Sequence, residues 1–471
     1  MARLLTIIKG GRVLDPANAV DMTGDVLIEG DVIKAAGADL SPRASTGSAR
    51  TEIKVIEAKG LVVAPGFVDL HTHLREPGYE YKETIETGTR AAARGGFTTI
   101  CAMPNTEPAM DNRGTVDYVM QRAAEQGLVR VLPIGAVTKG REGKLLAELG
   151  ELADAGCIGF SDDGSPVADA SIMRHALEYA SALGPSTIRQ DSGQAPSISS
   201  GQAGSGRGLA IIDHCEDPQL AGGVMHEGWV STRLGLKGIP SASEENMVAR
   251  DIALARQTGG HVHIAHLSTA GAVELVRRAR AEGAHVTAEV TPHHLALTHE
   301  AVMHREGYER LAYDTNAKMY PPLRGEADVA ACIAGLMDGT IDAIATDHAP
   351  HAVQEKLCEF DLAANGIVGL ETALALSLTA AVTLERVVEA LTIGPVRALG
   401  LDRSIPGIGT LSEGAPADVV IFDPKREWTV DPADFVSKGK STPLAGRTLR
   451  GAVVATVYAG EVVHALEGTG A

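Results

Sequence analysis

The sequence predicts an α/β protein: a (β/α)8 barrel with a small composite β-domain formed by the N- and C-terminal segments. Eight apolar, β-rich segments lie between residues 65 and 351, and most are followed by an Ala-, Leu- and Glu-rich helical pattern. Strands that alternate with helices pair in parallel through right-handed crossovers, and eight such units close a TIM barrel. Both chain ends instead show short β-like runs separated by glycine turns, so we expect them to share one small sheet.

The composition agrees with this fold and excludes several classes of function. The 471 residues are 44% apolar but only 3% aromatic, which suits a core of small aliphatic side chains. A net charge of −18 disfavours nucleic acid and anionic lipid and favours a small-molecule substrate. No stretch approaches the roughly 20 apolar residues of a membrane span, so we expect no membrane partner and a cytoplasmic location. The five cysteines lack C-x-x-C spacing and are expected to be reduced thiols.

These patterns divide the chain into three segments. Residues 1–62, with "LLTIIKGGRVLD" and "GDVLIEGDVIKAAG", form the first part of the β-domain. Residues 63–400 form the barrel. Residues 401–471, with "GTLSEGAPADVVIFDP" and "GRTLRGAVVATVYAGEVVHAL", complete the β-domain. The stretch 186–208 breaks the pattern, because its Ser, Gly and Gln residues can bury little surface, and it predicts a mobile loop inserted before the fifth strand.

The eight barrel segments start apolar, and nearly all of them end in His, Asp, Asn or Thr. They read "FVDLHTHL", "FTTICAMPN", "VRVLPIGAVT", "CIGFSDDG", "LAIIDHCED", "HVHIAHLST", "HVTAEVTPHHL" and "IDAIATDHAPH". Sites in such barrels are assembled at the C-terminal ends of the strands, so these polar ends predict one shared site. "KETIETGTRAAARGG" and "DIALARQTGG" have the pattern of the intervening helices, each closing on glycine.

Several strand ends carry residues of the metal-ligand type. His71 and His73 are two residues apart in an extended strand and therefore share a face. The other candidates each lie at the end of a strand of their own: Asp162 or Asp163, His214, His266 and Asp347. Imidazole and carboxylate groups without thiolate favour Zn²⁺ over the alternatives Mn²⁺, Co²⁺ and Fe²⁺. Four His with two Asp exceed the roughly three protein ligands of one catalytic zinc. The set predicts two metal ions, bridged by a carboxylate and a hydroxide.

The motifs around these residues resemble the dihydroorotase family of the amidohydrolase superfamily, in its long bacterial type I form. The resemblance runs over almost the whole chain and lies in "GFVDLHTHLREPG", "AMPNTEP", "GFSDDGSPV", "DHCED", "HVHIAHLST", "EVTPHHL", "PPLR", "ATDHAPH" and "GLETAL". It implies two zinc ions, one held by His71, His73 and Asp347 and the other by His214 and His266. It also selects Asp163, rather than Asp162, as the bridging carboxylate.

The same resemblance implies the reversible, zinc-dependent ring closure of N-carbamoyl-L-aspartate to L-dihydroorotate plus water, in pyrimidine biosynthesis. Asp347 is the implied catalytic residue, moving a proton between the hydroxide and the amide nitrogen. Arg75 offers a planar fork of N–H groups to the substrate carboxylate, and by resemblance Asn105 and His351 join it. We expect backbone groups near Ala363 and Gly366 to line the substrate. A homodimer is expected, and association with aspartate transcarbamoylase is left open.

Other residues have weaker interpretations. His261 and His263 share a face earlier in their strand and are predicted to be packed or supporting groups. His293 and His294 are left between supporting the ligands and ordinary core packing. Tyr320 of "MYPPLR" stands where relatives usually have Asn, so recognition of the substrate ring is expected to be changed or shared with a neighbouring residue.

Two rival functions are weighed against this interpretation. Hydantoinases, dihydropyrimidinases and allantoinases share the barrel and the His-x-His, but typically bridge their metals with a carboxylated lysine on the fourth strand. The fourth strand here reads "CIGFSDDG" and has no lysine. The second rival is a catalytically silent homologue that scaffolds aspartate transcarbamoylase. Such a protein is expected to have lost metal ligands, whereas all six are present here.

Overall fold

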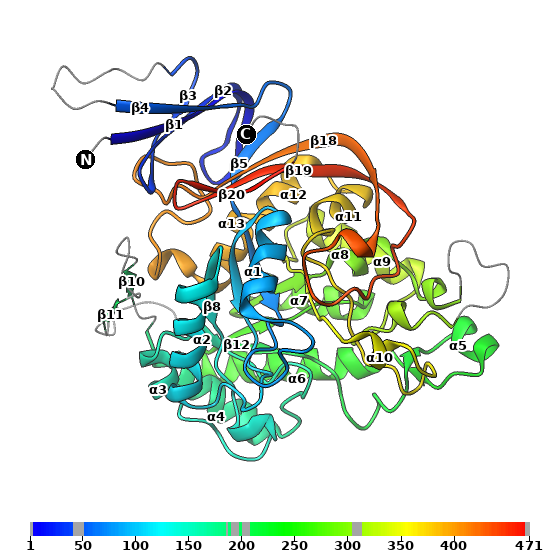
Figure 1. Cartoon of the computed structure of the whole chain (residues 1–471). Helices are drawn as coiled ribbons and strands as arrows, with labels where there is room; N and C mark the ends of the chain where they lie inside the picture. The colour runs from blue at the N-terminus through cyan, green and yellow to red at the C-terminus, as the bar shows by residue number, and fades with distance from the viewer. Residues whose placement is uncertain are drawn as a thin grey trace.

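The fold consists of a barrel and a small sheet packed against one side of it. The computed structural model describes residues 3–40, 51–184, 187–189, 197–199, 208–303 and 313–466. Figure 1 shows the first strands, in blue, and the last strands, in red, lying together on that side, near both termini. The predicted α/β class with a composite terminal β-domain is confirmed.

The small sheet has eight strands in the order β20-β19-β18-β5-β1-β2-β3, with β4 beside β1. Its strands are β1 (Arg3–Asp15), β2 (Val20–Glu29), β3 (Val32–Gly37), β4 (Thr51–Glu57), β5 (Val62–Pro65), β18 (Val419–Thr429), β19 (Thr448–Tyr458) and β20 (Glu461–Ala465). The short β5 joins the two ends of the chain, because it pairs in parallel with β1 and antiparallel with β18. It leads directly into the first barrel strand.

All eight predicted barrel strands are present. They are β6 (Phe67–Thr72), β7 (Phe97–Ala102), β8 (Arg130–Pro133), β9 (Gly159–Phe160), β12 (Ala210–Asp213), β15 (His261–Ile264), β16 (Val286–Val290) and β17 (Ala343–Ile344). They form two parallel sheets, β6-β7-β8 and β9-β12-β15-β16-β17. Parallel bridges from Gly135 to Phe160 and from Thr72 to His348 join the sheets at both seams, so the ring is closed.

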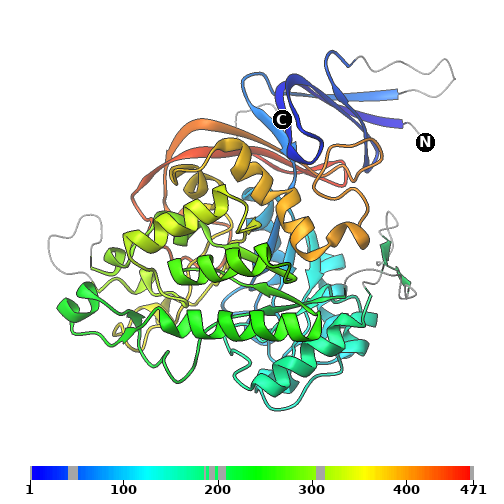
Figure 2. The ribbon, with the colours of Figure 1, turned by 180° about the vertical axis from the view of Figure 1, so that it is seen from behind.

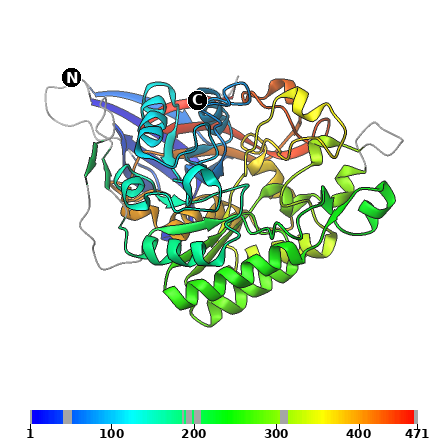
Figure 3. The ribbon, with the colours of Figure 1, turned by 90° about the horizontal axis from the view of Figure 1, so that it is seen from below.

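Helices cover the outside of this ring. They are α1 (Ile85–Arg94), α2 (Arg113–Gln126), α3 (Leu149–Asp154), α4 (Ala170–Ser181), α5 (Trp229–Leu234), α6 (Ala242–Thr258), α7 (Ala270–Ala281), α8 (Pro292–Ala296), α9 (Glu326–Met337), α10 (Val353–Lys356), α11 (Ala373–Thr379), α12 (Leu384–Leu391) and α13 (Ile393–Leu399). In Figures 2 and 3 the green helices, α6 among them, lie outside the strands. Gly259, with φ +71°, ends α6 in the left-handed conformation that favours glycine, as its sequence predicts.

Apolar side chains fill the barrel on both faces of the strands. Leu70, Cys101, Leu132 and Ile212 belong to one buried cluster of strand residues. The alternate strand residues, such as Ile100, pack with the surrounding helices in a second cluster. A strand buried on both faces places its polar residues where the apolar pattern ends, which is the rim of the barrel.

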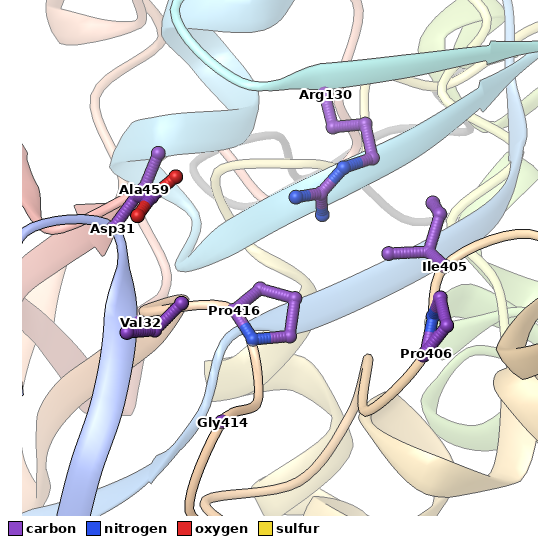
Figure 4. A pocket seen from close by; sticks show the side chains of 8 residues that line it. All are labelled: Asp31, Val32, Arg130, Ile405, Pro406, Gly414, Pro416 and Ala459. Carbon is purple, nitrogen blue, oxygen red and sulfur yellow. The ribbon is translucent and has the colours of Figure 1, made fainter. Parts of the chain in front are cut away.

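The interface between the small sheet and the barrel contains a pocket of about 180 Å³, shown in Figure 4. Arg130, the first residue of β8, lies in its wall and is buried. Its guanidinium donates to Asp418 at 2.7 Å and to Thr99 at 2.8 Å. This ion pair therefore fastens the small sheet to the N-terminal end of the barrel, opposite the end where the polar strand ends gather.

Two other predictions concern the remainder of the chain. Most of the stretch 186–208, predicted to be a mobile loop, lies outside the described residues, although β10 (Thr187–Arg189) and β11 (Ser197–Ser199) form an antiparallel pair. The five cysteines are free thiols, as expected. Within the described ranges, no helix has both the length and the apolar character to cross a membrane.

Candidate metal centre

The six candidate metal ligands converge at the C-terminal rim of the barrel. Each of them lies at the end of a strand or within three residues of it: His71 and His73 (β6), Asp163 (β9), His214 (β12), His266 (β15) and Asp347 (β17). All six are buried. Their nitrogen and oxygen atoms form three overlapping triads, with the atoms of each triad within 4.8 Å of one another.

Asp163 lies at the middle of this cluster and faces all four histidines. Its Oδ1 is 3.2 Å from His71 Nε2, 3.5 Å from His266 Nε2 and 3.6 Å from His214 Nδ1. Its Oδ2 is 3.5 Å from His73 Nε2. A carboxylate whose two oxygens face different histidines has the geometry of a bridge between two cations.

Asp347 approaches the cluster from the side of His71 and His73. Its Oδ1 is 3.0 Å from His73 Nε2 and 3.5 Å from His71 Nε2. Burial opposes ionisation of this carboxyl, but the charge of His71 and the hydrogen bond with His73 outweigh it and hold its pKa well below the usual range. For Asp163 burial is likewise outweighed, by His71 and by contacts with His214 and His266, and its pKa is also low. Both are therefore carboxylates at neutral pH.

Unsatisfied polar atoms indicate that a cation belongs in this cluster. His71 Nε2 and Asp163 Oδ1 are buried and, although they lie 3.2 Å apart, they form no hydrogen bond with each other or with any other group in the described part of the chain. Buried polar atoms without partners are costly, and proteins normally satisfy them. A metal ion between them would satisfy both. The donor set of imidazole nitrogens and carboxylate oxygens therefore fits a binuclear metal site.

Asp162 and Asp163 are adjacent but have different surroundings. Asp162 turns away from the cluster and accepts hydrogen bonds from the backbone N–H groups of Val137 (2.9 Å) and Thr138 (3.1 Å). The hydroxyl of Thr138 also donates to it. Asp162 thus fixes the loop after β8, while Asp163 faces the histidines.

Three of the predicted site residues have a left-handed backbone. Arg75 has φ +62°, Asp347 +44° and His266 +34°. Non-glycine residues rarely adopt these angles, which cost about 1–3 kcal/mol each unless the surrounding structure imposes them. The rim is therefore held in a strained conformation by packing and hydrogen bonds around it.

Two polar side chains orient the histidines of β6 from behind. Asn105 Oδ1 accepts from His73 Nδ1 at 2.8 Å, and Glu289 Oε1 accepts from His71 Nδ1 at 2.8 Å. These bonds place the Nδ1 protons of both rings away from the cluster and turn their Nε2 atoms toward Asp163 and Asp347. Asn105 was predicted as a substrate residue, whereas the sequence interpretation missed Glu289. A carboxylate inside the short predicted strand "VTAEV" was an available indication.

Arg75 and His351 lie on the same rim. Arg75 is buried, and its hydrogen bond within the described structure runs from Nε to the carbonyl of Pro350 at 3.3 Å. Its two terminal NH₂ groups thus remain for an anion. His351 Nε2 donates to the carbonyl of Asn365 at 2.8 Å, and its Nδ1 lies 3.4 Å from Glu355.

Ala363 and Gly366 lie in the segment that follows His351. Their N–H groups donate to the carbonyls of Glu359 and Lys318, each at 3.0 Å, so a ligand could meet only their carbonyls or their neighbours. A side chain at Gly366 would place its Cβ 2.4 Å from the carbonyl oxygen of Ala349. Glycine is therefore required for the close approach of these segments.

Tyr320 forms part of a pocket beside the cluster. Its ring centroid lies 4.6 Å from that of His214, with the rings tilted by 38°. The pocket has a volume of about 340 Å³ and is also lined by Lys318, Ala363 and Asn365. Tyr320, where the resemblance led us to expect Asn, therefore places an aromatic ring against a candidate metal ligand.

The four histidines with weaker interpretations have different surroundings. His263 Nε2 lies 3.2 Å from Glu289, behind His71, and is a supporting group. His261 bonds Thr287 at 2.8 Å and stacks on His285. His294 is a satisfied core residue, bonded to Thr291 and to the carbonyl of Pro321. His293 Nε2 is buried and has no partner in the described ranges.

The fold and the cluster define a metal-dependent cyclic amidohydrolase, and comparisons with known proteins give the family. A family model described as dihydro-orotase-like matches residues 60–194 and 198–272. The dihydroorotase of Anaeromyxobacter sp. (strain K) is 51% identical over 463 residues, which cover 97% of each chain. That of Geotalea daltonii is 48% identical over 462 residues, covering 97% of this chain and 98% of the relative. The chain belongs to the dihydroorotase family.

Solved structures agree on the architecture. An L-hydantoinase (dihydropyrimidinase) from Arthrobacter aurescens is 25% identical, with a TM-score of 0.79 over 98% of this chain and 96% of that chain. A dihydropyrimidinase from Brevibacillus agri is 21% identical, with a TM-score of 0.78 over 98% of this chain and 95% of that one, and shows the fold alone. Both support the (β/α)8 barrel with its terminal sheet.

Proposed function

We propose that the protein interconverts N-carbamoyl-L-aspartate and L-dihydroorotate, and that two zinc ions at the rim cluster support the reaction. The observation that carries the proposal is the position of one buried guanidinium, Arg75, on the rim that also holds the ligand cluster. A cyclic amide with an external carboxylate requires both features, a centre that acts on the ring amide and a cation for the carboxylate.

We assign the first ion to His71, His73 and Asp347 and the second to His214 and His266, with Asp163 between them. Two bound divalent ions would lower the pKa of a bridging water and polarise the ring carbonyl. Zinc is favoured because the ligands are imidazoles and carboxylates without thiolate.

The chain's own groups then have separate roles. Asp347, a carboxylate at neutral pH, accepts at Oδ the proton that the attacking water loses and passes it to the amide nitrogen as the C–N bond of the ring breaks. Arg75 holds the substrate carboxylate through its terminal NH₂ groups. Asn105 and His351 contact the same carboxylate. The segment at Ala363 and Gly366 contributes backbone carbonyls to the opposite wall.

The rival functions account less well for these residues. In a hydantoinase-type site a carboxylated lysine would bridge the metals, whereas the fourth-strand segment here has no lysine and its Asp163 faces the four histidines. A silent scaffold would have no need for six buried ligand residues within one cluster. Both observations favour catalysis of the dihydroorotase reaction.

We also propose the organisation of the protein around this activity. Segments 1–62 and 401–471 form one β-domain around the barrel of residues 63–400. The protein acts in the cytoplasm as a homodimer. An association with aspartate transcarbamoylase, whose product is the substrate proposed here, is to be tested by co-purification.

A substrate panel tests the proposed function. We expect purified, zinc-loaded protein to interconvert L-dihydroorotate and N-carbamoyl-L-aspartate, and to act on hydantoin and allantoin at far lower rates. Absorbance of the cyclic substrates and chromatography of the products provide the measurement. Opening of hydantoin without turnover of dihydroorotate would contradict the proposal, and inactivity toward all four compounds at full zinc content would favour the silent homologue.

Substitution of Arg75 tests its role in binding the carboxylate. We expect Arg75→Met to lower kcat/KM for dihydroorotate by about 10- to 100-fold, mostly through KM, because a charge-assisted hydrogen bond contributes about 1.5–3 kcal/mol. Arg75→Lys keeps the charge but loses the planar fork, so we expect an intermediate loss. Zinc content should stay unchanged in both variants. An unaltered KM in Arg75→Met would remove this residue from the substrate site.

A further inference from the structure

The two halves of the candidate metal centre are supported differently. His71 and His73 each have a side-chain acceptor behind the ring, Glu289 and Asn105 respectively. His214 Nε2, in contrast, is buried and has no partner among the described residues. His214 and His266 contact each other at 2.9 Å between Nδ1 and Nε2. No acceptor behind His214 corresponds to Glu289 or Asn105 among the described residues, so the backbone that carries His214 has a larger part in placing its ring.

That backbone is tied to a buried charged group, which we call the Arg324 cluster: Arg324, Glu216, Glu244 and Ser268. Arg324 is only 1% exposed, and both glutamates are buried. Its guanidinium donates to Ser268 Oγ at 3.0 Å and to Glu216 at 3.3 Å, and lies 3.6 Å from Glu244. No metal-ligand role is assigned to any member of this cluster.

Glu244 holds the chain just after His266. One of its oxygens accepts from the N–H groups of Ser268 (3.1 Å) and Thr269 (3.0 Å) and from the Thr269 hydroxyl (2.9 Å). The Ser268 hydroxyl donates to its other oxygen. Because His266 has φ +34°, its conformation needs such restraint, and the anchored residues begin only two positions further on.

Glu216 provides the corresponding link to His214, two residues before it. Its N–H donates to the carbonyl of His214 at 3.0 Å. Its carboxylate accepts hydrogen bonds from the Ser243 hydroxyl and the Arg324 guanidinium. Arg324 thus joins the segments after β12 and β15, although it lies in the "PPLR" motif more than fifty residues beyond His266.

We propose that Arg324, acting through Glu216 and Glu244, is a positioning residue that sets the separation of His214 and His266 and so the affinity for the second metal ion. This inference rests on the proposed two-metal function. A lysine at this position would keep the charge but could not contact Ser268, Glu216 and Glu244 together, because it lacks the guanidinium fork.

The test is the zinc content of Arg324→Lys at controlled free zinc. At a free zinc concentration that just saturates wild-type protein with about two ions per chain, we expect Arg324→Lys to hold about one. After loading at higher zinc, we expect the variant to release its second ion to a chelator about 10- to 100-fold faster than wild-type protein does. The matched control is Arg130→Lys, which changes another buried, carboxylate-paired arginine at the opposite end of the barrel. It should retain both ions, even if its thermal stability falls as much.

A double variant identifies which ion is lost. Glu289→Gln weakens the support of His71, so we expect it to loosen the first ion. If the two changes act on different ions, the double variant Arg324→Lys/Glu289→Gln should retain almost none at the same free zinc. Retention of one ion by the double variant would overturn the assignment to His214 and His266. Mn²⁺ loading gives a second measurement of how many ions each chain holds. A close pair of Mn²⁺ ions has a spin-coupled electron paramagnetic resonance spectrum, and loss of one ion abolishes it.

A milder substitution covers the case in which Arg324→Lys does not fold. Ser268→Ala removes the hydroxyl that contacts both Arg324 and Glu244, with little change in volume. Like Arg324→Lys, it should release one ion faster than wild-type protein does. Release at the wild-type rate from Ser268→Ala or from folded Arg324→Lys would refute the inference. Failure of the proposed function would be recognised separately, because wild-type protein would then lack two ions or turnover of dihydroorotate.

Discussion

Asp347→Asn is expected to lower kcat for dihydroorotate by about 1,000-fold while leaving a folded protein. The asparagine keeps the size of the side chain and one oxygen toward the metal. It cannot accept the proton, because its amide is not basic. The carboxylate of Asp347 is well placed for the transfer, since its Oδ1 faces the Nε2 atoms of His73 and His71 at 3.0 Å and 3.5 Å. Steady-state rates in both directions provide the measurement.

The control for this prediction is Asp162→Asn. Asp162 is also a buried aspartate at the rim, but it faces the backbone of Val137 and Thr138 rather than the cluster. Its replacement should reduce stability more than catalysis. Zinc analysis of Asp347→Asn must accompany the rates, so that loss of the proton acceptor is separated from loss of metal. Near-normal turnover at full zinc content would eliminate Asp347 as the proton carrier.

The sequence predicted the elements that depend on local pattern. His71 and His73 share a face because strand residues alternate, and eight apolar segments with polar ends indicated a rim site. The predicted segments are longer than the strands that they contain, however. β9 and β17 contain only two residues each, because the chain leaves the regular sheet before it reaches Asp163 and Asp347. Regular pairing ends where the ligands must turn inward.

Contacts between distant residues could not be predicted in this way. Asp162 and Asp163 are adjacent in one motif, and the backbone N–H groups of Val137 and Thr138, which hold Asp162, leave Asp163 to face the histidines. The pairing of Glu289 with His71 spans 218 residues, and that of Arg324 with Glu216 spans 108. No periodicity links such positions, since closure of the barrel alone brings them together.

Removal of the metal ions should lower the rate of dihydroorotate turnover by about 1,000-fold or more, because Lewis-acid stabilisation contributes several kcal/mol to a metal-assisted reaction. The cluster gives a structural reason to expect little residual activity. The buried His71 Nε2 and Asp163 Oδ1 have no hydrogen-bond partner among the described residues, and the charge of His71 outweighs burial and holds the pKa of Asp163 and of Asp347 low, so the cluster is suited to hold cations.

Reconstitution distinguishes one required ion from two. Apo-protein prepared with a chelator and titrated with zinc should recover activity with an end point near two equivalents per chain, because the proposed function requires an ion in each half of the centre. The thermal unfolding temperature, followed in the same titration, should rise with each equivalent of zinc, since bound metal stabilises only the folded state. Full activity at one equivalent would exclude the two-metal arrangement, and full activity of the metal-free protein would exclude metal catalysis altogether.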